Sequence, residues 1–131
     1  MTARPQLTDH ERRTMGDIVD FSRIAARLVA RGRHAYDHDE MLPLAAEAVL
    51  HRVGEAVARL PGTLTADHPE VRWRLMRGMR NLIAHEYEVV DPVIVWNTLV
   101  HELPIDAAAI QAILEGSVMN NVTENDAPSP P

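Results

Sequence analysis

The chain contains no cysteine, and lysine is absent too, so that all thirteen Lys/Arg positions are arginine. The lack of cysteine excludes a disulfide framework, a thiolate nucleophile and a zinc site built on cysteines. It is also typical of a reducing compartment, and we expect a cytoplasmic protein. The lack of lysine means that every long cationic side chain is a planar guanidinium, which can bind phosphate or carboxylate through two parallel hydrogen bonds.

Aromatic residues are also few, with two Trp, two Tyr and one Phe among 131 residues. Because 46% of the residues are hydrophobic, the core must consist mainly of aliphatic side chains, which suits helices. We find no apolar run long enough to span a bilayer and no apolar stretch of a signal peptide near residue 1, so we expect no membrane partner. The formal net charge of −6 argues against non-specific coating of nucleic acid, but it allows a local basic site.

Capping residues and apolar periodicity predict two long helices in the first half of the chain. Thr8 and Glu11 form the pattern of a capping box, which predicts a helix that ends near Gly32. A polar connection is expected next. A second helix follows at about residues 41–60, with Pro43 in its first turn, since a proline in a helix interior costs about 3 kcal/mol.

The second half predicts three more helices. After a loop, Pro69 is expected to open a third helix that runs to about Glu88. Asp91 caps a fourth helix, and Pro104 is expected to break the chain before a short fifth one.

The fifth helix is expected to end near Gly116 and to leave a polar, proline-ended tail at residues 117–131, for which we predict disorder. Residues 1–116 then form a single domain. The predicted fold class is all-α, an up-and-down antiparallel bundle of four to five helices.

The third helix has an unusual polar face. Its apolar side holds the Met and Leu side chains, among them Leu75, Met76 and Met79, and the two methionines are expected in the core. A helical wheel puts Trp73 on the polar face, near Arg80, together with Arg74, Arg77, Arg80, Asn81, His85 and Tyr87. A row of arginines can hold a phosphate, and histidine is the natural proton carrier near neutral pH. The combination suits metal-free cleavage of an RNA phosphodiester, for which Asn81, Arg77 and Arg74 would be supporting phosphate or RNA contacts.

The same pattern has a plainer interpretation. Arginine and glutamate on an exposed helix face are usually only solvated, and an isolated histidine is usually inert. A single histidine would also have to act as both the general acid and the general base. A symmetric dimer would supply a second copy of the helix.

The motif Arg80-Asn81-x-x-x-His85-x-Tyr87 resembles the Arg-x4-6-His motif of HEPN-domain ribonucleases, and more narrowly that of HepT-like toxins. "VGEAVARLP", residues 53–61, is similar to the Gly-Glu-Ala segment of this family. The resemblance extends over about residues 8–116.

The resemblance implies a HEPN-like bundle that forms a homodimer with both motifs at the dimer cleft. It implies a metal-independent endoribonuclease that needs no cofactor and acts as the toxin of a type II toxin–antitoxin pair. In the catalytic roles it implies, Arg80 stabilises the scissile phosphate of an RNA substrate and His85 is the acid/base.

The resemblance also implies a partner, an MntA-like nucleotidyltransferase antitoxin that adds AMP to the motif tyrosine, which is Tyr87 here. Because the wheel puts Tyr87 beside Arg80, a nucleotide on this tyrosine would fill the site with phosphate and block RNA.

Other interpretations stay open. The chain could be a non-catalytic helical module that binds nucleotide or RNA beside a nucleotidyltransferase, or a structural helical dimer without a site. A second cluster, at residues 34–39, is either a metal-ligand set or a polar connection and contains His34, Asp37, His38 and Asp39. Glu55 either supports the site or lies on a helix face, and Glu86 and Glu88 have no assigned role.

Overall fold

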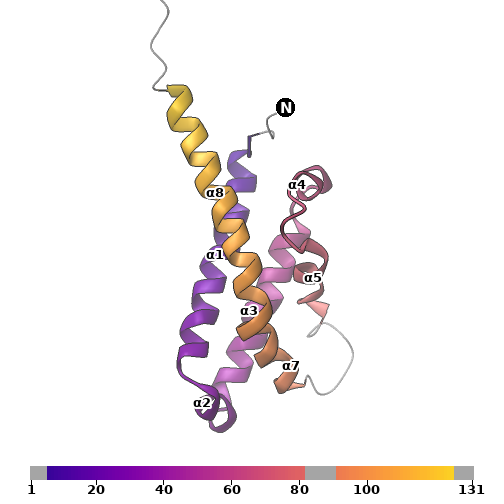
Figure 1. Cartoon of the computed structure of the whole chain (residues 1–131). Helices are drawn as coiled ribbons and strands as arrows, with labels where there is room; N and C mark the ends of the chain where they lie inside the picture. The colour runs from indigo at the N-terminus through magenta and orange to yellow at the C-terminus, as the bar shows by residue number, and fades with distance from the viewer. Residues whose placement is uncertain (1–5, 82–90, 126–131) are drawn as a thin grey trace, which may run out of the picture.

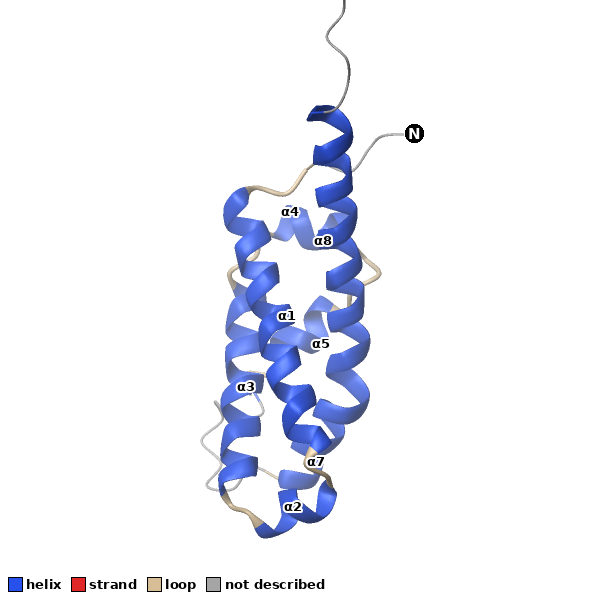
Figure 2. Cartoon of the chain, turned by 90° about the vertical axis from the view of Figure 1, so that its left-hand side faces the viewer, coloured by secondary structure: helices blue, strands red, loops and turns tan. Residues whose placement is uncertain are grey.

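The structure is a computed structural model that describes residues 6–81 and 91–125, with side chains as far as residue 117. All regular structure in these residues is helical, which confirms the predicted all-α class. Figures 1 and 2 show an up-and-down arrangement in which neighbouring arms run in opposite directions. Its main arms are α1 (Asp9–Ala30), α3 (Met41–Ala58), α5 (Trp73–Gly78), and α7 (Pro92–Asn97) continued by α8 (Leu103–Asn125). α1 packs against both α3 and α8.

The first helix begins as predicted. The Thr8 hydroxyl accepts the Glu11 N–H at 3.1 Å and the Glu11 carboxylate accepts the Thr8 N–H at 3.0 Å, which completes the capping box. The helix ends at Ala30, and Gly32 takes a φ of 91°, a conformation that favours glycine.

The polar connection expected next is instead a short helix, α2 (Arg33–His38). Its anchor is Tyr36, which is 2% exposed and whose hydroxyl donates to the Pro92 carbonyl at 2.9 Å. The Tyr36 ring also lies 4.8 Å from the Trp96 ring, measured between centroids. These contacts with α7 order a segment that is polar in sequence.

The second long helix is α3, and Pro43 lies in its first turn as predicted. The loop expected after it contains a helical turn, α4 (Gly62–Asp67). Leu64 is only 5% exposed, so an apolar anchor holds α4 against the bundle. With α2 and α4, the described residues contain more helices than the four to five predicted.

The predicted third helix is wrong in its start and its continuity. It begins at Trp73 instead of Pro69, because the Arg72 N–H donates to Asp106 Oδ1 at 3.0 Å and the indole N–H of Trp73 donates to the His68 carbonyl at 2.8 Å. α5 ends at Gly78, residues 79–80 form a turn, and Asn81 is again helical. The stretch 82–88 of the predicted helix lies outside the described residues.

The wheel also misplaced two side chains of this helix. Trp73, expected on the polar face, is buried, whereas Leu75, expected on the apolar side, is 42% exposed. Residues 73–78 form one regular helix, and it turns the side that carries Trp73 and Met76 towards the core, which leaves Leu75 exposed.

Asp91 caps α7 as predicted, and its Oδ1 accepts the Val93 N–H at 2.9 Å. Pro104, however, does not break the chain. A π-helical turn, η1 (Thr98–Glu102), joins α7 to α8, and the Leu103 N–H donates back to the Thr98 carbonyl. This wider turn accommodates the proline, which has no N–H to donate.

The separate fifth helix ending near Gly116 is therefore also wrong, since α8 continues to Asn125. Part of the segment predicted to be a disordered tail is helical, and residues 126–131 lie outside the description.

Once joined, the helical stretch Pro92–Ser117 has the length and the mean hydropathy of 1.2 that a membrane-spanning helix needs, although no apolar run of that length was expected. In the fold it packs against α1 and contributes Leu99, Leu103 and Ile110 to the core. It also carries Asp106 in an ion pair with Arg72. These are the contacts of a core helix in a bundle.

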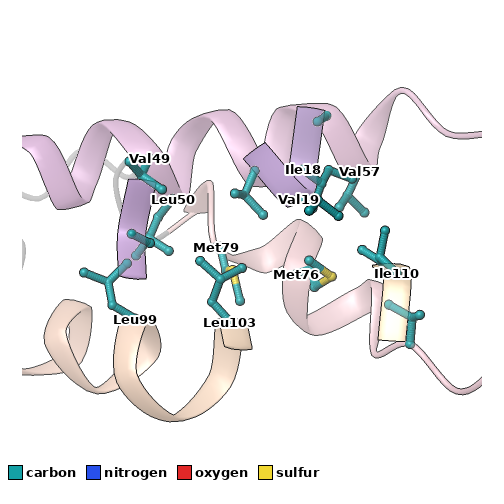
Figure 3. Packing of buried hydrophobic residues seen from close by; sticks show 14 of the residues in the cluster. Ile18, Val19, Val49, Leu50, Val57, Met76, Met79, Leu99, Leu103 and Ile110 are labelled. Atoms are coloured by element: carbon teal, nitrogen blue, oxygen red, sulfur yellow. The ribbon is translucent and has the colours of Figure 1, made fainter. Parts of the chain in front are cut away.

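The core is mainly aliphatic, as predicted, and includes Met15, Met76 and Met79. Figure 3 shows side chains from α1, α3, the α5 segment and α8 meeting in one cluster. Met76 and Met79 are both buried in it, as expected. Burial of each such side chain contributes about 1.5–3 kcal/mol, so the cluster fixes how the turn after α5 sits against α3.

Candidate active site

α3 and the turn after α5 lie very close together at Gly54. A Cβ atom placed on Gly54 would lie 2.6 Å from the Arg80 backbone nitrogen and 2.6 Å from its Cβ. Only glycine allows the two backbones to come this near. Gly54 therefore sets the position from which the Arg80 side chain leaves the chain.

The next residue of α3 holds the arginine head group. Arg80 Nη1 donates to Glu55 Oε1 at 3.2 Å, and the two side chains are 35% and 44% exposed. Among the described residues this is the ion pair of Arg80, and it occupies one guanidinium N–H. The remaining donors can serve an anion from solvent. Of the two roles left open for Glu55, the contact favours support of the site.

The other predicted arginines lie on a different element from Arg80. Arg74 and Arg77 are exposed and lie on α5, three residues apart, whereas Arg80 follows in the turn. No described carboxylate forms an ion pair with Arg74 or Arg77. Asn81 is exposed and lies directly after Arg80. The arginine stripe is thus not the product of one continuous helix.

His85 and Tyr87 lie outside the described residues, as do Glu86 and Glu88. Their predicted roles beside Arg80 stay predictions.

A groove that sequence reasoning missed lies beside the Arg80–Glu55 pair. It has a volume of about 440 Å³ and is lined by Phe21 of α1, by Ala48, His51, Arg52 and Glu55 of α3, and by Arg59, the residue directly after α3. Four of these residues are polar and recur within about two helical turns at the end of α3. A helical wheel of α3, like the one drawn for the third helix, could have revealed them.

The histidine and aspartate cluster at residues 34–39 does not assemble a metal site. The His34 and His38 rings stack with centroids 4.1 Å apart, and His38 Nδ1 lies 2.8 Å from the His34 carbonyl oxygen. Over residues 6–81 and 91–117, where side chains are described, no three His, Asp or Glu side chains are grouped to hold a metal ion. Within the described chain, this segment is a polar helical connection.

Comparisons with known proteins identify the family of the chain. The family model described as "Ribonuclease HepT-like" matches residues 18–113. A provisionally assigned RNase of Caldanaerobacter subterraneus subsp. tengcongensis is 35% identical over 77 residues, which cover 59% of this chain and 69% of that protein. A provisionally assigned ribonuclease HepT of Thermococcus cleftensis is 33% identical over 66 residues, covering 50% of this chain and 60% of that protein.

A further relative, a provisionally assigned RNase of Methanocaldococcus jannaschii, is 27% identical over 90 residues, covering 69% of this chain and 72% of that protein. No solved structure gives a significant match. The family match covers most of the chain and includes Gly54, Glu55 and Arg80. The chain therefore belongs to the HepT-like ribonuclease family.

Proposed function

We propose that this protein is a metal-independent endoribonuclease and the toxin of a type II toxin–antitoxin pair, with Arg80 and His85 as its catalytic residues. The observation that carries the proposal is the fixed position of Arg80. Its backbone packs against Gly54, and its partly exposed guanidinium is held by Glu55 at 3.2 Å. An arginine oriented in this way, in a chain of a ribonuclease family, is suited to a phosphate.

The proposed chemistry assigns one task to each residue. Arg80 stabilises the charge that builds up on the phosphorane. His85 takes the 2′-hydroxyl proton or protonates the leaving oxygen, and a homodimer brings a second His85 for the other transfer. Asn81 helps to position the phosphate, and Arg74 and Arg77 contact the RNA backbone.

The proposed control acts on Tyr87. An MntA-like nucleotidyltransferase would transfer AMP to this tyrosine, seven residues after Arg80 in the sequence. If the intervening chain is helical, seven residues are about two turns, so the AMP phosphate would lie on the side of Arg80 and compete with RNA. This assignment rests on the resemblance of the motif.

RNA cleavage in the presence of EDTA tests the catalytic assignment. We expect the purified protein to cleave single-stranded RNA with EDTA present, and we expect Arg80→Gln and His85→Ala each to lower kcat at least about 100-fold. Arg13→Gln removes the same charge from an exposed position at the start of α1 and should leave cleavage unchanged.

Two outcomes would contradict the proposal. Cleavage at the wild-type rate by both active-site variants would show that the residues are wrongly assigned. RNA that the wild type binds but leaves intact would favour the non-catalytic binding module.

The toxin role predicts that expression of the wild type arrests cell growth. Co-expression of the nucleotidyltransferase should relieve the arrest caused by the wild type, but not the arrest caused by Tyr87→Phe.

A further inference from the structure

The groove beside the candidate site is continuous with it through one residue. Glu55 lines the groove and also forms the ion pair with Arg80. A polymer whose phosphate contacts Arg80 must extend away from it, and the groove is a described depression that touches this pair.

The groove also offers cations that the fold leaves unused. Arg52 and Arg59 are both exposed, and no described carboxylate forms an ion pair with either. The carboxylate between them, Glu55, is already paired with Arg80. In a chain of net charge −6, this leaves a local excess of positive charge along one face of α3.

The spacing of these arginines suits a chain molecule. Arg52 and Arg59 are seven residues apart, which is two helical turns, or about 10.5 Å along one face. They can therefore contact separate phosphates. The α1 wall of the groove is the half-buried ring of Phe21, an apolar surface on which a base can stack.

We propose that this groove binds the RNA strand next to the scissile phosphate, with Arg52 and Arg59 on backbone phosphates and a base against Phe21. The proposal rests on the proposed ribonuclease function and adds to it the single-stranded character of the substrate and the path of the strand. An acidic segment of a protein could also pair with the two arginines, but the aromatic wall and the contact with the Arg80 pair favour RNA.

The affinity for a short RNA tests the groove proposal independently of cleavage. The ligand is a single strand of about ten nucleotides with 2′-O-methyl riboses, which cannot be cleaved through the 2′-hydroxyl. We expect Arg52→Gln/Arg59→Gln to bind it at least about tenfold more weakly than wild type, and the salt slope of log K to fall by about 1.4, or about 0.7 per lost phosphate contact. Phe21→Leu should weaken binding about fivefold without changing that slope.

The matched control is Arg27→Gln/Arg31→Gln. It removes the same charge from exposed positions near the end of α1, outside the groove lining, and should bind RNA within about twofold of wild type. Equal losses in both double variants would show a general charge effect and overturn the proposal. Wild-type RNA binding by the groove variant, with loss of nucleotidyltransferase binding, would identify a protein interface instead and also overturn it.

Cleavage kinetics separate this proposal from the catalytic one. The groove variant should cleave a dinucleotide like wild type, but its kcat/KM on a strand of about ten nucleotides should fall about tenfold. A wild type that cleaves neither substrate would contradict the catalytic proposal while the binding assay still decides the groove. If the wild type cleaves both substrates and the groove variant keeps the wild-type kcat/KM on the longer strand, the groove proposal alone is contradicted.

Discussion

At the scale of single residues, Gly54 links the sequence of α3 to the position of Arg80. Glycine in a helix interior is usually unfavourable by about 0.5–1 kcal/mol relative to alanine. Here a Cβ would meet the Arg80 backbone nitrogen at 2.6 Å, so the missing side chain is what allows the contact. The resemblance named a Gly-Glu-Ala segment, and the structure supplies a physical reason for its first two residues.

Gly54→Ala should accordingly damage both stability and activity. We expect the overlap to outweigh the better helix propensity and to lower the free energy of unfolding by about 1–3 kcal/mol. Displacement of Arg80 by about 1 Å should lower RNA cleavage about 100-fold. Urea denaturation and cleavage assays measure the two effects.

Gly16→Ala is the matched control, since Gly16 lies within α1 and a Cβ there would meet nothing within 4 Å. It should raise the free energy of unfolding by about 0.5–1 kcal/mol and leave cleavage unchanged. If the two variants behave alike, the close approach of α3 to Arg80 is not what requires glycine.

At the scale of elements, the start of α5 is set by a contact with α8. Asp106 is 1% exposed, and its carboxylate accepts the Arg72 backbone N–H at 3.0 Å and the Arg72 Nη2–H at 2.8 Å. The hydrogen bond to Asp106 is the main reason that the pKa of Arg72 is raised above its usual value. This contact ties the residue before α5 to a helix more than thirty positions away, which no local pattern around Pro69 reveals.

Asp106→Asn should loosen this tie. The amide nitrogen would face guanidinium donors inside the protein, and we expect the Tm to fall by about 5–10 °C. Glu102→Gln is the control, because Glu102 also pairs with Arg72, at 2.9 Å, but its side chain is 40% exposed. An exposed pair contributes little, so this variant should lose no more than about 2 °C. Equal Tm losses in thermal unfolding would show that burial of Asp106 is not the deciding factor.

The junction of α7 and α8 shows how one element replaced two predicted ones. Pro104 was expected to break the chain, because proline cannot donate to the carbonyl four residues earlier. The π-helical turn at Thr98–Glu102 shifts the bonding by one residue just before the proline and lets the helix continue. Packing of Leu99 and Leu103 in the core holds this turn in place.

At the scale of the whole molecule, the composition makes alkaline pH unusually informative. Because the chain has no lysine and no cysteine, the two tyrosines are the side chains that titrate near pH 10. Burial raises the pKa of Tyr36 above its usual value of 10.0, and the nearby Glu47 carboxylate raises it further. The folded state therefore keeps the phenol proton at a pH where the unfolded chain has lost it.

The free energy of unfolding should then fall as pH rises above about 10, towards the raised pKa of Tyr36. Below that pH the contribution is fully present, since the phenol is neutral in both states. Tyr36→Phe should lack the decline, although it starts about 1 kcal/mol lower because the hydrogen bond to Pro92 is lost. Denaturation series between about pH 8 and 11 measure this, with Tyr87→Phe as the control that keeps the decline. A decline of the same size in Tyr36→Phe would exclude Tyr36 as its source.

Local signals were reliable where the interaction is local. The capping box of Thr8 and Glu11, the Asp91 cap and the first-turn Pro43 all depend on residues within a few positions of one another, and each was found as predicted. Burial of Met76 and Met79 also followed from apolar periodicity. The groove on α3 was predictable in part, because its polar residues share one face of a helix, but its α1 wall was not.

By itself, the sequence determined the all-α class, the caps of α1 and α7, an aliphatic core and the resemblance to HepT-like ribonucleases that the family match confirms. Each of these is set by composition or by spacing within one or two helical turns. Tertiary structure alone decided where α5 begins and ends and how the helix continues through Pro104. It also decided that Gly54 and Glu55 hold Arg80 in place. The start of α5 and the position of Arg80 depend on contacts between residues about 25 to 35 positions apart, and such contacts exist only once the helices have packed.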